Sequence, residues 1–355
     1  MKALVLSGGS GTRLRPFSYS MPKQLIPVAN KPVLEHVLES IRDLGVTDIG
    51  IIVGDRASEI AEVVGDGARF GARITYVRQD RPLGLAHCVR LARSFLGEDD
   101  FVMYLGDNML PQGIDALAAD FHRHHPAAQV VVRRVADPRA FGVAELGPDG
   151  TVVRLVEKPE KPASDLALVG VYFFTPAIHE AVDAIRPSAR GELEITDAIQ
   201  WLVTQGADVR AGEYAGYWKD TGRAEDVLDC NRWMLARLVP RVDGDVDAAS
   251  EIVGRVVVEA GARVVRSRIV GPAIIGAHTV VEDCHIGPDS AIGEHCVLRA
   301  TRLADSIVMA GASITEVPGL AASLIGRAAS VGPSAHVDAH HRLVVGDHTR
   351  VEVAA

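Results

Sequence analysis

The stretch Lys2–Lys23 reads KALVLSGGSGTRLRPFSYSMPK and joins a short apolar run to a glycine-rich turn and a group of cations. An apolar run that ends in glycines is typical of a buried parallel strand whose carboxyl end borders a ligand crevice. The turn is not a Walker A loop, because Thr-Arg follows its last glycine where that motif has Lys followed by Ser or Thr. It is not a dinucleotide fingerprint, because Leu14 occupies the place of the third small residue. Backbone N–H groups in such a turn can approach an anion closely, although for the loop alone a flexible connection with solvated arginines is an open alternative.

Outward from this stretch, apolar runs alternate with helical periodicity. Further strands are expected at 49–54, 73–77 and 101–107, and helices at 32–45, 58–67 and 83–96. This alternation predicts an α/β fold, a Rossmann-like doubly wound sheet. Shorter strands follow residue 128, with helices expected at 175–185, 192–206 and 223–237. Thr175 is expected to cap the first of these helices, with Pro176 at its first position.

Beyond residue 240 the sequence changes to a six-residue repeat. Aliphatic residues six apart form three series: Ile269, Ile275 and Val281; Ile286, Ile292 and Leu298; and Ile325, Val331 and Val337. The phase slips by one residue between 281 and 286, and the repeat is imperfect between 299 and 324. Such a repeat predicts a left-handed hexapeptide-repeat β-helix over 241–355, after a first domain of 1–240. A β-sandwich with coincidental spacing is the alternative.

Composition excludes several classes of protein. With 355 residues, 48% of them hydrophobic and 23% charged, the chain is expected to form two ordinary globular domains. A formal net charge of -9 argues against nucleic acid or a membrane as partner. The opening apolar run is too short for a signal peptide, which predicts a cytoplasmic protein. The four cysteines form no C-x-x-C pair, so we expect buried free thiols rather than disulfides or a zinc site.

More motifs follow the glycine turn along the chain. They are PKQLIPV (22–28), RQDRPLGLAH (78–87), LGDN (105–108), FGVAE (141–145), VEKP (156–159), VGVYFF (169–174), SARGELEITD (188–197) and YWKDTG (217–222). With GGxGTRL, this series over residues 1–235 resembles the sugar-phosphate nucleotidylyltransferases, in a long form that carries an added β-helix. The resemblance implies transfer of a thymidylyl group from dTTP to glucose 1-phosphate, with release of pyrophosphate and with Mg²⁺ as cofactor.

The resemblance also assigns the phosphate chemistry to particular residues. Arg13 and Lys23 are implied as the catalytic cations, which stabilise charge on the α-phosphate and on the departing pyrophosphate. Asp107 and Asp220 are implied as ligands of Mg²⁺, which prefers a few oxygen ligands together with substrate phosphates. Either Asp alone could be a turn or cap residue. The substrate-binding residues implied around these groups are Gly8, Gly9, Gly11, Thr12 and Asn108.

Sugar and base contacts are implied by the remaining motifs. Lys158 and Arg190 match residues that hold the sugar phosphate, and Glu157 matches an acid that hydrogen-bonds sugar hydroxyls. The other implied contacts are Gly142 and Val169 to the sugar, and Gln79, Gly84 and Leu85 to the base. Glutamine can offer both a donor and an acceptor to thymine or uracil. A structural role is equally open for Glu194.

Two alternative functions stay open. One is a UTP-dependent sugar-1-phosphate uridylyltransferase fused to an acetyltransferase, for which His278, His285 and His295 would be candidate residues. Scattered histidines on β-helix rungs are, however, more often exposed structural residues. The other is a non-catalytic subunit that senses sugar nucleotides, which would be expected to have lost an active-site cation or carboxylate. The β-helix is also expected to build or brace a homo-oligomer.

Overall fold

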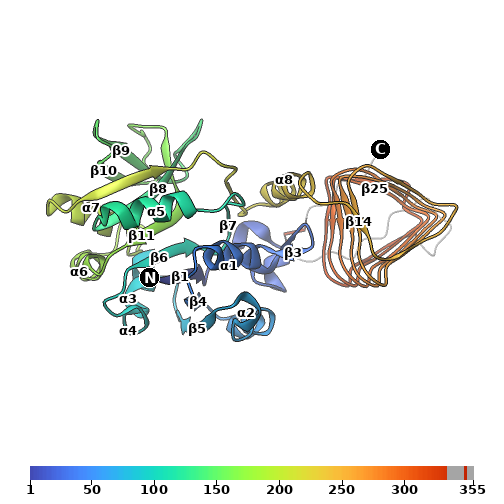
Figure 1. Ribbon diagram of the computed structural model, residues 1–355, viewed down its shortest axis with the longest axis horizontal. Coiled ribbons are helices and arrows are strands. Elements are labelled where there is room, and N and C mark those ends of the chain that lie inside the picture. The colour runs from blue at the N-terminus through green and yellow to red at the C-terminus, as the bar shows by residue number, and fades with distance from the viewer. Residues whose placement is uncertain (334–347, 350–355) are drawn as a thin grey trace. The chain divides into compact units, whose positions relative to one another are not determined.

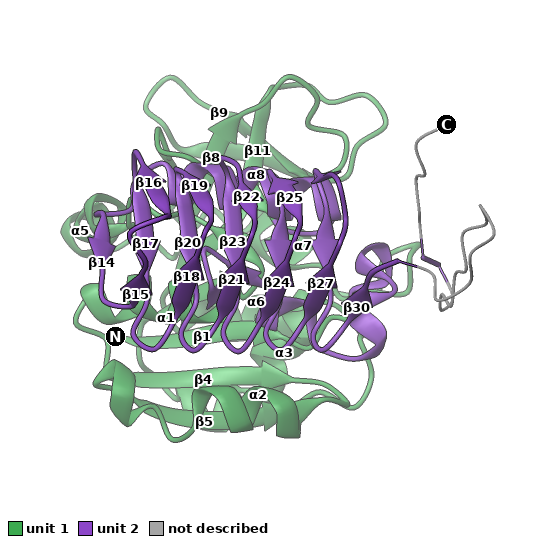
Figure 2. Ribbon diagram, turned by 90° about the vertical axis from the view of Figure 1, so that its right-hand side faces the viewer, with its two compact units in different colours: residues 1–10, 33–220 green, residues 11–32, 221–355 purple. Residues whose placement is uncertain are grey.

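Figure 1 shows a computed structural model of the chain, in which residues 1–333 and 348–349 are described. The chain forms two compact units, residues 1–10 with 33–220 and residues 11–32 with 221–355, which Figure 2 colours separately. The last glycine of the turn, Gly11, and the two cations implied as catalytic, Arg13 and Lys23, therefore belong to the second unit, although they come early in the sequence. The domain boundary expected at residue 240 stays a prediction.

A nine-stranded mixed sheet forms the centre of the first unit. Its path runs β10-β9-β11-β6-β1-β4-β5, with β8 paired to β11 and β12 paired to β8. The strands are β1 (Lys2–Ser7), β4 (Asp48–Val53), β5 (Arg73–Arg78), β6 (Phe101–Leu105), β8 (Ala128–Arg134), β9 (Gly142–Leu146), β10 (Val152–Glu157), β11 (Leu166–Phe174) and β12 (Val209–Glu213). Strands β6, β1, β4 and β5 pair in parallel. The first three are the apolar runs expected of strands that are buried on both faces, whereas β5 is a partly exposed edge strand.

Seven α-helices of the first unit connect these strands. They are α1 (Val33–Asp43), α2 (Ala57–Val64), α3 (Leu85–Leu91), α4 (Arg93–Leu96), α5 (Asp115–His124), α6 (Ala177–Ala184) and α7 (Ile195–Thr204). Leu4 and Leu6 of β1 share one buried apolar cluster with Ala86 and Val89 of α3. The Rossmann-like architecture predicted from the alternating pattern is therefore confirmed. Within the described residues, no helix has the length and apolar character needed to cross a membrane.

Two local expectations were wrong. The single helix expected over 83–96 is interrupted at Ala92, which separates α3 from α4. Thr175 does not cap α6, because both its backbone N–H and its hydroxyl donate to the Ala127 carbonyl, at 3.2 Å each. Thr175 thus extends the pairing of β11 with β8, and Pro176 precedes the first residue of α6 with no side-chain cap.

The second unit combines the early segment 11–32 with the C-terminal part of the chain. The early segment holds three short 3-10 helices and a hairpin: η1 (Thr12–Leu14), η2 (Phe17–Tyr19), η3 (Lys23–Leu25), β2 (Pro27–Val28) and β3 (Lys31–Pro32). Helix α8 (Ala224–Leu235) follows residue 220, and its central residues Val227 and Asn231 are fully buried. After α8 the chain enters a stack of short parallel strands.

The stacked strands form the three faces of a β-helix, seen as successive coils in Figure 2. The first face has β14 (Arg241–Val242), β17 (Val256–Val258), β20 (Ala273–Ile275), β23 (Ser290–Ile292), β26 (Ile307–Val308) and β29 (Leu324–Ile325). The second has β15 (Asp245–Val246), β18 (Arg263–Val265), β21 (Val280–Glu282), β24 (Val297–Arg299), β27 (Ser313–Thr315) and β30 (Ser330–Val331). The third has β16 (Glu251–Val253), β19 (Arg268–Val270), β22 (His285–Ile286), β25 (Arg302–Ala304) and β28 (Leu320–Ala321).

Strand register explains the slipped phase of the repeat. Ile269 pairs with Ile286, and Val281 pairs with Leu298, so these coils take 17 residues, whereas Ile292 pairs with Val308 across a coil of 16. A coil of 17 is two sides of six residues and one side of five, and the slip between 281 and 286 is the short side. The stretch 299–324, where the repeat looked imperfect, continues the same buried core through Leu303, Val308 and Ile314. Val337 of the expected series lies outside the described residues.

All four cysteines are free and buried, as expected from their spacing. Burial raises the pKa of the Cys88 thiol to about 12 and also raises the pKa of Cys284 and of Cys296. These thiols stay protonated near neutral pH, so they act as small apolar side chains in the two cores.

Candidate active site

Two carboxylates meet on a small ribbon just beyond the central strand β6. Asp107 stands directly before β7 (Asn108–Met109), which pairs antiparallel with β13 (Lys219–Asp220). In this register Asp220 lies opposite Asn108, so Asp107 and Asp220 occupy neighbouring positions of the ribbon. The ribbon brings together two motifs, LGDN and YWKDTG, that lie far apart in the sequence.

Side chains of the ribbon are held by hydrogen bonds. The Trp218 indole N–H donates to Asn108 Oδ1 at 2.7 Å, and Asn108 Nδ2 donates to Asp107 Oδ1 at 3.2 Å. Asp107 is 8% exposed and Asn108 is 4% exposed, so both side chains are buried. Asn108 thus orients the Asp107 carboxylate, a role for Asn108 that the LGDN motif alone did not reveal.

The carboxylate pair fits a hard divalent cation. Two carboxylates supply only part of a coordination shell, and across the described part of the chain no group of three or more His, Cys, Asp or Glu could hold a metal ion. Mg²⁺ usually takes one or two carboxylates and completes its shell with water and substrate phosphates. Asp107 and Asp220 are therefore a donor set that suits Mg²⁺ at a phosphate-binding site and does not suit a structural zinc.

A second group of residues surrounds the Glu157 carboxylate at the end of β10. Thr196 Oγ1 donates to Glu157 Oε2 at 2.8 Å, and a Cβ on Gly142 would lie 3.2 Å from the same oxygen. Glu157 pairs with Gly142 across the β9–β10 ladder. The carboxylate is therefore fixed on one side, and its other oxygen, Oε1, faces two cations.

Those cations are Lys158 and Arg190, the two residues assigned to the sugar phosphate. Lys158 Nζ lies 3.5 Å and Arg190 Nη1 lies 3.4 Å from Glu157 Oε1. Arg190 Nη1 also lies 3.5 Å from Glu194 Oε1, which accepts a 2.9 Å hydrogen bond from Ser188. Both cations are about two-fifths exposed, so they are held near the acids yet reachable by an incoming anion.

Glu194 lies just before α7 rather than on it, and its carboxyl group is buried. Burial raises the pKa of this carboxyl, while the Ser188 hydrogen bond and Arg190 act in the opposite direction. Lys158 has φ 42, a left-handed conformation that non-glycine residues adopt rarely and that is frequent at functional sites.

The residues assigned to the base form a third group. Gln79 Nε2 lies 3.0 Å from His87 Nδ1 and donates to the Gly84 carbonyl at 3.4 Å. Burial lowers the pKa of His87, and nearby Arg90 lowers it further, which favours the neutral ring whose Nδ1 can accept from the Gln79 amide. This arrangement orients Gln79 Oε1 toward the glycine turn, 3.2 Å from the position of a Cβ on Gly8. The oxygen of Gln79 is thus the atom offered as an acceptor.

Gly84 shows why this position needs glycine. It has φ 104, and a Cβ would lie 2.4 Å from the Leu193 carbonyl oxygen. The Leu193 N–H donates to the Leu83 carbonyl at 2.8 Å, and the Ala86 N–H donates to the Leu193 carbonyl at 3.0 Å. Leu193 therefore joins the loop before Leu85, which is the first residue of α3, to the segment that carries Arg190.

The glycine turn is divided between the two units. Gly8 and Gly9 follow β1 in the first unit, whereas Gly11, Thr12, Arg13 and Lys23 lie in the second. Gly11 has φ 62, and a Cβ there would lie 3.1 Å from Lys23 Cβ, so the turn packs directly on η3. The Arg13 side chain is exposed and Lys23 is half-buried. Within the second unit, the structure thus joins the turn to the lysine ten residues after Arg13.

In the first unit the structure brings the assigned residues into one neighbourhood. The base group is joined to the sugar-phosphate group through Leu193, as described above. Val169 is fully buried in β11, and a Cβ on the following residue, Gly170, would lie 3.1 Å from Asn108 Nδ2. This contact joins the sugar side to the carboxylate ribbon. The proposed roles of Arg13 and Lys23 toward these groups stay predictions.

Sequence reasoning missed three residues of this neighbourhood and one residue of the second unit. Thr196 and Ser188 orient the two acids, and His87 orients Gln79. In the second unit, Gln24 is 1% exposed, and its Oε1 has no hydrogen-bond partner within the described residues. All four lie inside the motifs quoted above, one to three residues from a charged residue in the sequence. A search for polar residues beside those charges could have found them.

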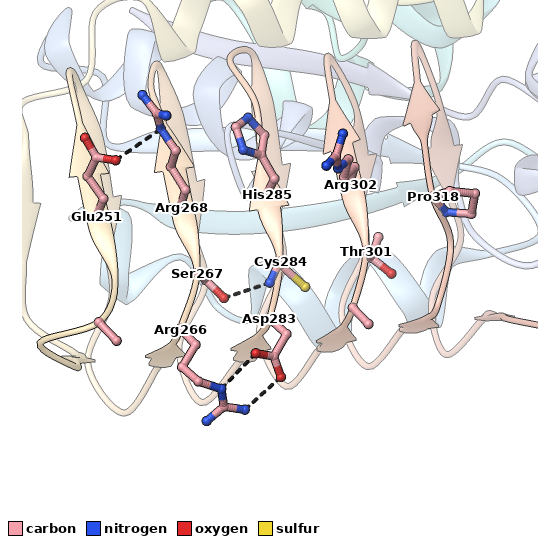
Figure 3. A pocket seen from close by; sticks show the side chains of 12 residues that line it. Glu251, Arg266, Ser267, Arg268, Asp283, Cys284, His285, Thr301, Arg302 and Pro318 are labelled. Atoms are coloured by element: carbon pink, nitrogen blue, oxygen red, sulfur yellow. Dashed lines mark hydrogen bonds and ion pairs between the residues drawn. The ribbon is translucent and has the colours of Figure 1, made fainter.

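A groove of about 640 Å³ lies on the third face of the β-helix, apart from every assigned residue (Figure 3). Arg268, His285 and Arg302 are register partners on neighbouring strands and form a row along it. Two acids line the groove: Asp283 accepts hydrogen bonds from Arg266 at 2.8 and 2.7 Å, and Glu251 pairs with Arg268 at 3.3 Å. His278 and His295 stack on each other at a corner 5.1 Å apart, and all three histidines are exposed. They occupy outward positions of the coils, as expected for structural residues.

The fold and the grouped charges define a class of enzyme. The chain belongs to the nucleotidyl transferase family, whose pattern matches residues 2–237, and it is a nucleotidyltransferase. Enzymes of this family generally use a divalent metal ion. Residues 269–354 match a second pattern, described as the GMPPB C-terminal domain.

Individual relatives narrow the comparison. The chain is 54% identical over 355 residues to the glucose-1-phosphate thymidylyltransferase of Streptomyces griseus, with 100% of both chains covered. It is 56% identical to the protein of the same name from Streptomyces antibioticus, with 99% of both covered. Among solved structures, it resembles one assigned as a glucose-1-phosphate thymidylyltransferase of Bacillus anthracis, with a TM-score of 0.62 and 33% identity over 68% of this chain and 97% of that one.

Proposed function

We propose that the chain transfers a thymidylyl group from dTTP to α-D-glucose 1-phosphate, giving dTDP-glucose and pyrophosphate, with Mg²⁺ as the metal ion. The observation that carries this proposal is the identity of 54% and 56%, over essentially the whole chain, to two proteins named for that activity. The clusters around Asp107 and Glu157 support it, because they combine a carboxylate pair with cations suited to a sugar phosphate. We further propose that the enzyme acts in the cytoplasm as a homo-oligomer.

The reaction has to bring two anions together. Two like unit charges about 4 Å apart repel by about 4 kcal/mol at an effective dielectric constant near 20, and the two reactants carry several such pairs. Cations must therefore surround the phosphates, and we assign this role to Arg13, Lys23, Lys158 and Arg190. When bound between Asp107 and Asp220, Mg²⁺ would neutralise phosphate charge and help to align the reactants.

The nucleophile needs no protein base. The second pKa of a phosphate monoester is about 6, so the sugar phosphate is already largely ionised at pH 7. Lys158 and Arg190 would hold this phosphate for in-line attack on the α-phosphorus, while Glu157 accepts hydrogen bonds from sugar hydroxyls. Arg13 would stabilise the charge that develops on the α-phosphate and on the departing pyrophosphate. This division explains why the site is built on cations and carboxylates rather than on a histidine dyad.

Base recognition is expected to favour dTTP without excluding UTP. Gln79 Oε1 would accept from the imide N–H, which thymine and uracil share, because the amide nitrogen is engaged by His87 and Gly84. Discrimination then depends on the thymine methyl, and one methyl in an apolar pocket is worth about 1–3 kcal/mol. Leu85 is the apolar side chain assigned to that contact. A uridylyltransferase activity is therefore the second candidate.

Pyrophosphate release tests the assignment. The full-length protein would be assayed with dTTP, UTP, ATP, CTP and GTP against the 1-phosphates of glucose, galactose, mannose and N-acetylglucosamine. We expect dTTP with glucose 1-phosphate to give the highest kcat/KM, roughly tenfold or more above UTP. Equal values for UTP and dTTP would remove the thymidylyl assignment and leave the transferase class, whereas no turnover with any pair would favour a sensing subunit.

Replacing Lys158 with alanine is expected to weaken binding of the sugar phosphate alone. A hydrogen bond to a charged group is worth about 1.5–3 kcal/mol, so KM for glucose 1-phosphate should rise about 10- to 100-fold. KM for dTTP should change less than twofold. Steady-state kinetics with each substrate varied in turn would measure both values.

Lys161 provides the matched control for this substitution. It is an exposed lysine three residues further along the same loop, and no role is assigned to it. Lys161→Ala should leave both KM values unchanged. Equal effects of the two substitutions, or a rise in KM for dTTP with Lys158→Ala, would contradict the role given to Lys158.

A further inference from the structure

We propose that Asn231 of helix α8 is a positioning residue for phosphate transfer, because it joins the hairpin after the phosphate-binding turn to the β-helix. The β-helix would then act on the reaction as a brace for the segment that carries Arg13 and Lys23. This inference rests on the proposed function, since it takes that segment to hold the phosphates. All the contacts that carry it lie within the second unit.

The hairpin between β2 and β3 turns through two residues in unfavourable conformations. Ala29 has φ 49 and Asn30 has φ 62, both in the left-handed region. Asparagine tolerates this region, but alanine rarely occupies it. Such a conformation persists where surrounding contacts determine it, so the bonds that hold Ala29 have a defined task.

Asn231 supplies one of those bonds and connects it to the β-helix. Its Oδ1 accepts the Ala29 N–H at 2.9 Å, and its Nδ2 donates to the carbonyl of Asp289 at 3.2 Å. Asn231 is fully buried, and Asp289 is the residue directly before β23. Both ends of one buried amide are thus used to join the hairpin and a β-helix coil. Truncation would remove the side-chain partner of both the Ala29 N–H and the Asp289 carbonyl.

A second bond runs in parallel with the first. Asn30 Nδ2 donates to the carbonyl of Ile292, at the end of the same strand β23, at 2.6 Å. The hairpin turn is therefore attached to both ends of one strand of the β-helix. Further along the β-helix, Arg327 Nη2 donates to the carbonyl of Ser20 at 2.8 Å. The segment 11–32 is held at two places by coils of the β-helix.

Only one residue separates the hairpin from the 3-10 helix that begins with Lys23. That residue, Ile26, is fully buried, as is Val28 in β2. Lys23 in turn packs on Gly11, the residue from which η1 and Arg13 follow. A displacement of the hairpin is therefore passed through packed side chains to both catalytic cations.

The chain contains a matched control on the same helix. Arg232, next to Asn231, donates to both oxygens of Asp305 at 2.6 and 2.8 Å, and Asp305 lies at the corresponding corner of the next coil. Arg232 therefore also ties α8 to the β-helix, but its hydrogen bonds and ion pairs within the described residues go to Asp305 and Asp229 rather than to the hairpin. Comparing the two positions separates a loss of α8 anchoring from a loss of hairpin positioning.

The test compares Asn231→Ala with Arg232→Ala in the full-length protein. Pyrophosphate release would be measured with the best nucleotide found for the parent protein, so the comparison stays valid whichever base is preferred. We expect Asn231→Ala to lower kcat at least tenfold with KM for the sugar phosphate within twofold, and Arg232→Ala to keep kcat within twofold. Hydrogen exchange of peptides spanning 11–32 should accelerate with Asn231→Ala only.

Asn30→Gly provides a second route if Asn231→Ala does not fold. Glycine accepts the left-handed φ of 62 at this position, so the substitution removes the bond to Ile292 at a half-buried site without straining the turn, and a smaller fall in kcat of the same kind is expected. Equal kcat losses for Asn231→Ala and Arg232→Ala would overturn the proposal, as would faster exchange of 11–32 with an unchanged kcat. Absence of turnover in the parent protein would instead count against the proposed function, while the exchange result would still report on the brace.

Discussion

Arg13→Ala is expected to lower kcat about 10²- to 10³-fold, the loss typical for removal of one preorganised donor to a developing anion. KM for glucose 1-phosphate should stay within about twofold, because Lys158 and Arg190 are the residues assigned to that phosphate. Arg13 is exposed, so the substitution should leave the melting temperature nearly unchanged. Steady-state kinetics and thermal unfolding of the same preparation would measure the three quantities.

Arg15 is the control for Arg13. It lies two residues further along the same segment, and its guanidinium sits 4.9 Å from the Tyr19 ring centroid. Arg15→Ala should lower kcat no more than a few fold. If Arg15→Ala and Arg13→Ala reduce kcat alike, the effect comes from the positive charge of the segment as a whole, and the specific role of Arg13 is lost.

Asp107→Asn and Asp220→Asn are each expected to lower kcat about a hundredfold or more, because bound metal supplies several kcal/mol of charge stabilisation. The Mg²⁺ concentration for half-maximal rate should also rise with each substitution, since one negatively charged ligand is removed. Asparagine keeps the shape of the side chain, so the β7–β13 ribbon should persist. Titration of the rate with Mg²⁺ would test both positions.

A binding measurement makes this test independent of turnover. Mn²⁺ can replace Mg²⁺ as an oxygen-preferring probe, and its binding can be followed by electron paramagnetic resonance in the presence of dTTP. Asp165→Asn provides the control, because Asp165 is half-exposed and pairs with Arg134 away from the ribbon. Unchanged Mn²⁺ binding and an unchanged Mg²⁺ dependence in both ribbon variants would show that these carboxylates do not hold the metal.

Local patterns in the sequence were enough to predict most of the fold. The apolar run before the glycine turn becomes β1 in the middle of the sheet, because a strand buried on both faces is apolar throughout. The six-residue repeat predicted a β-helix, and the slip at 281–286 already carried the length of the short side. The break at Ala92 could not be seen, because neither glycine nor proline marks it.

Contacts between distant residues explain what sequence could not supply at the site. Glu157 and Thr196 meet because α7 packs against β10, which no spacing in the sequence reveals. Thr175 has the residue type and position of a helix cap, but its N–H and its hydroxyl donate to the Ala127 carbonyl beside the β8–β11 ladder instead. The association of segment 11–32 with the β-helix had no local signal, because Asn30 and Asn231 lie about 200 residues apart in the chain.

The regular coils of the β-helix determine which insertions and deletions this protein can accommodate. When one whole coil is inserted or deleted, the inward side chains of all remaining coils still face inward. The stack can therefore gain or lose a coil, as repeat arrays do. A change of a single residue within a strand would instead reverse the facing of the side chains that follow it. The coil that contains β23 tolerates such changes less well, because the β2–β3 hairpin is hydrogen-bonded to it directly and through Asn231. A coil inserted between β23 and Arg327 would also separate the two places at which segment 11–32 is held, so this part of the stack is expected to keep its number of coils.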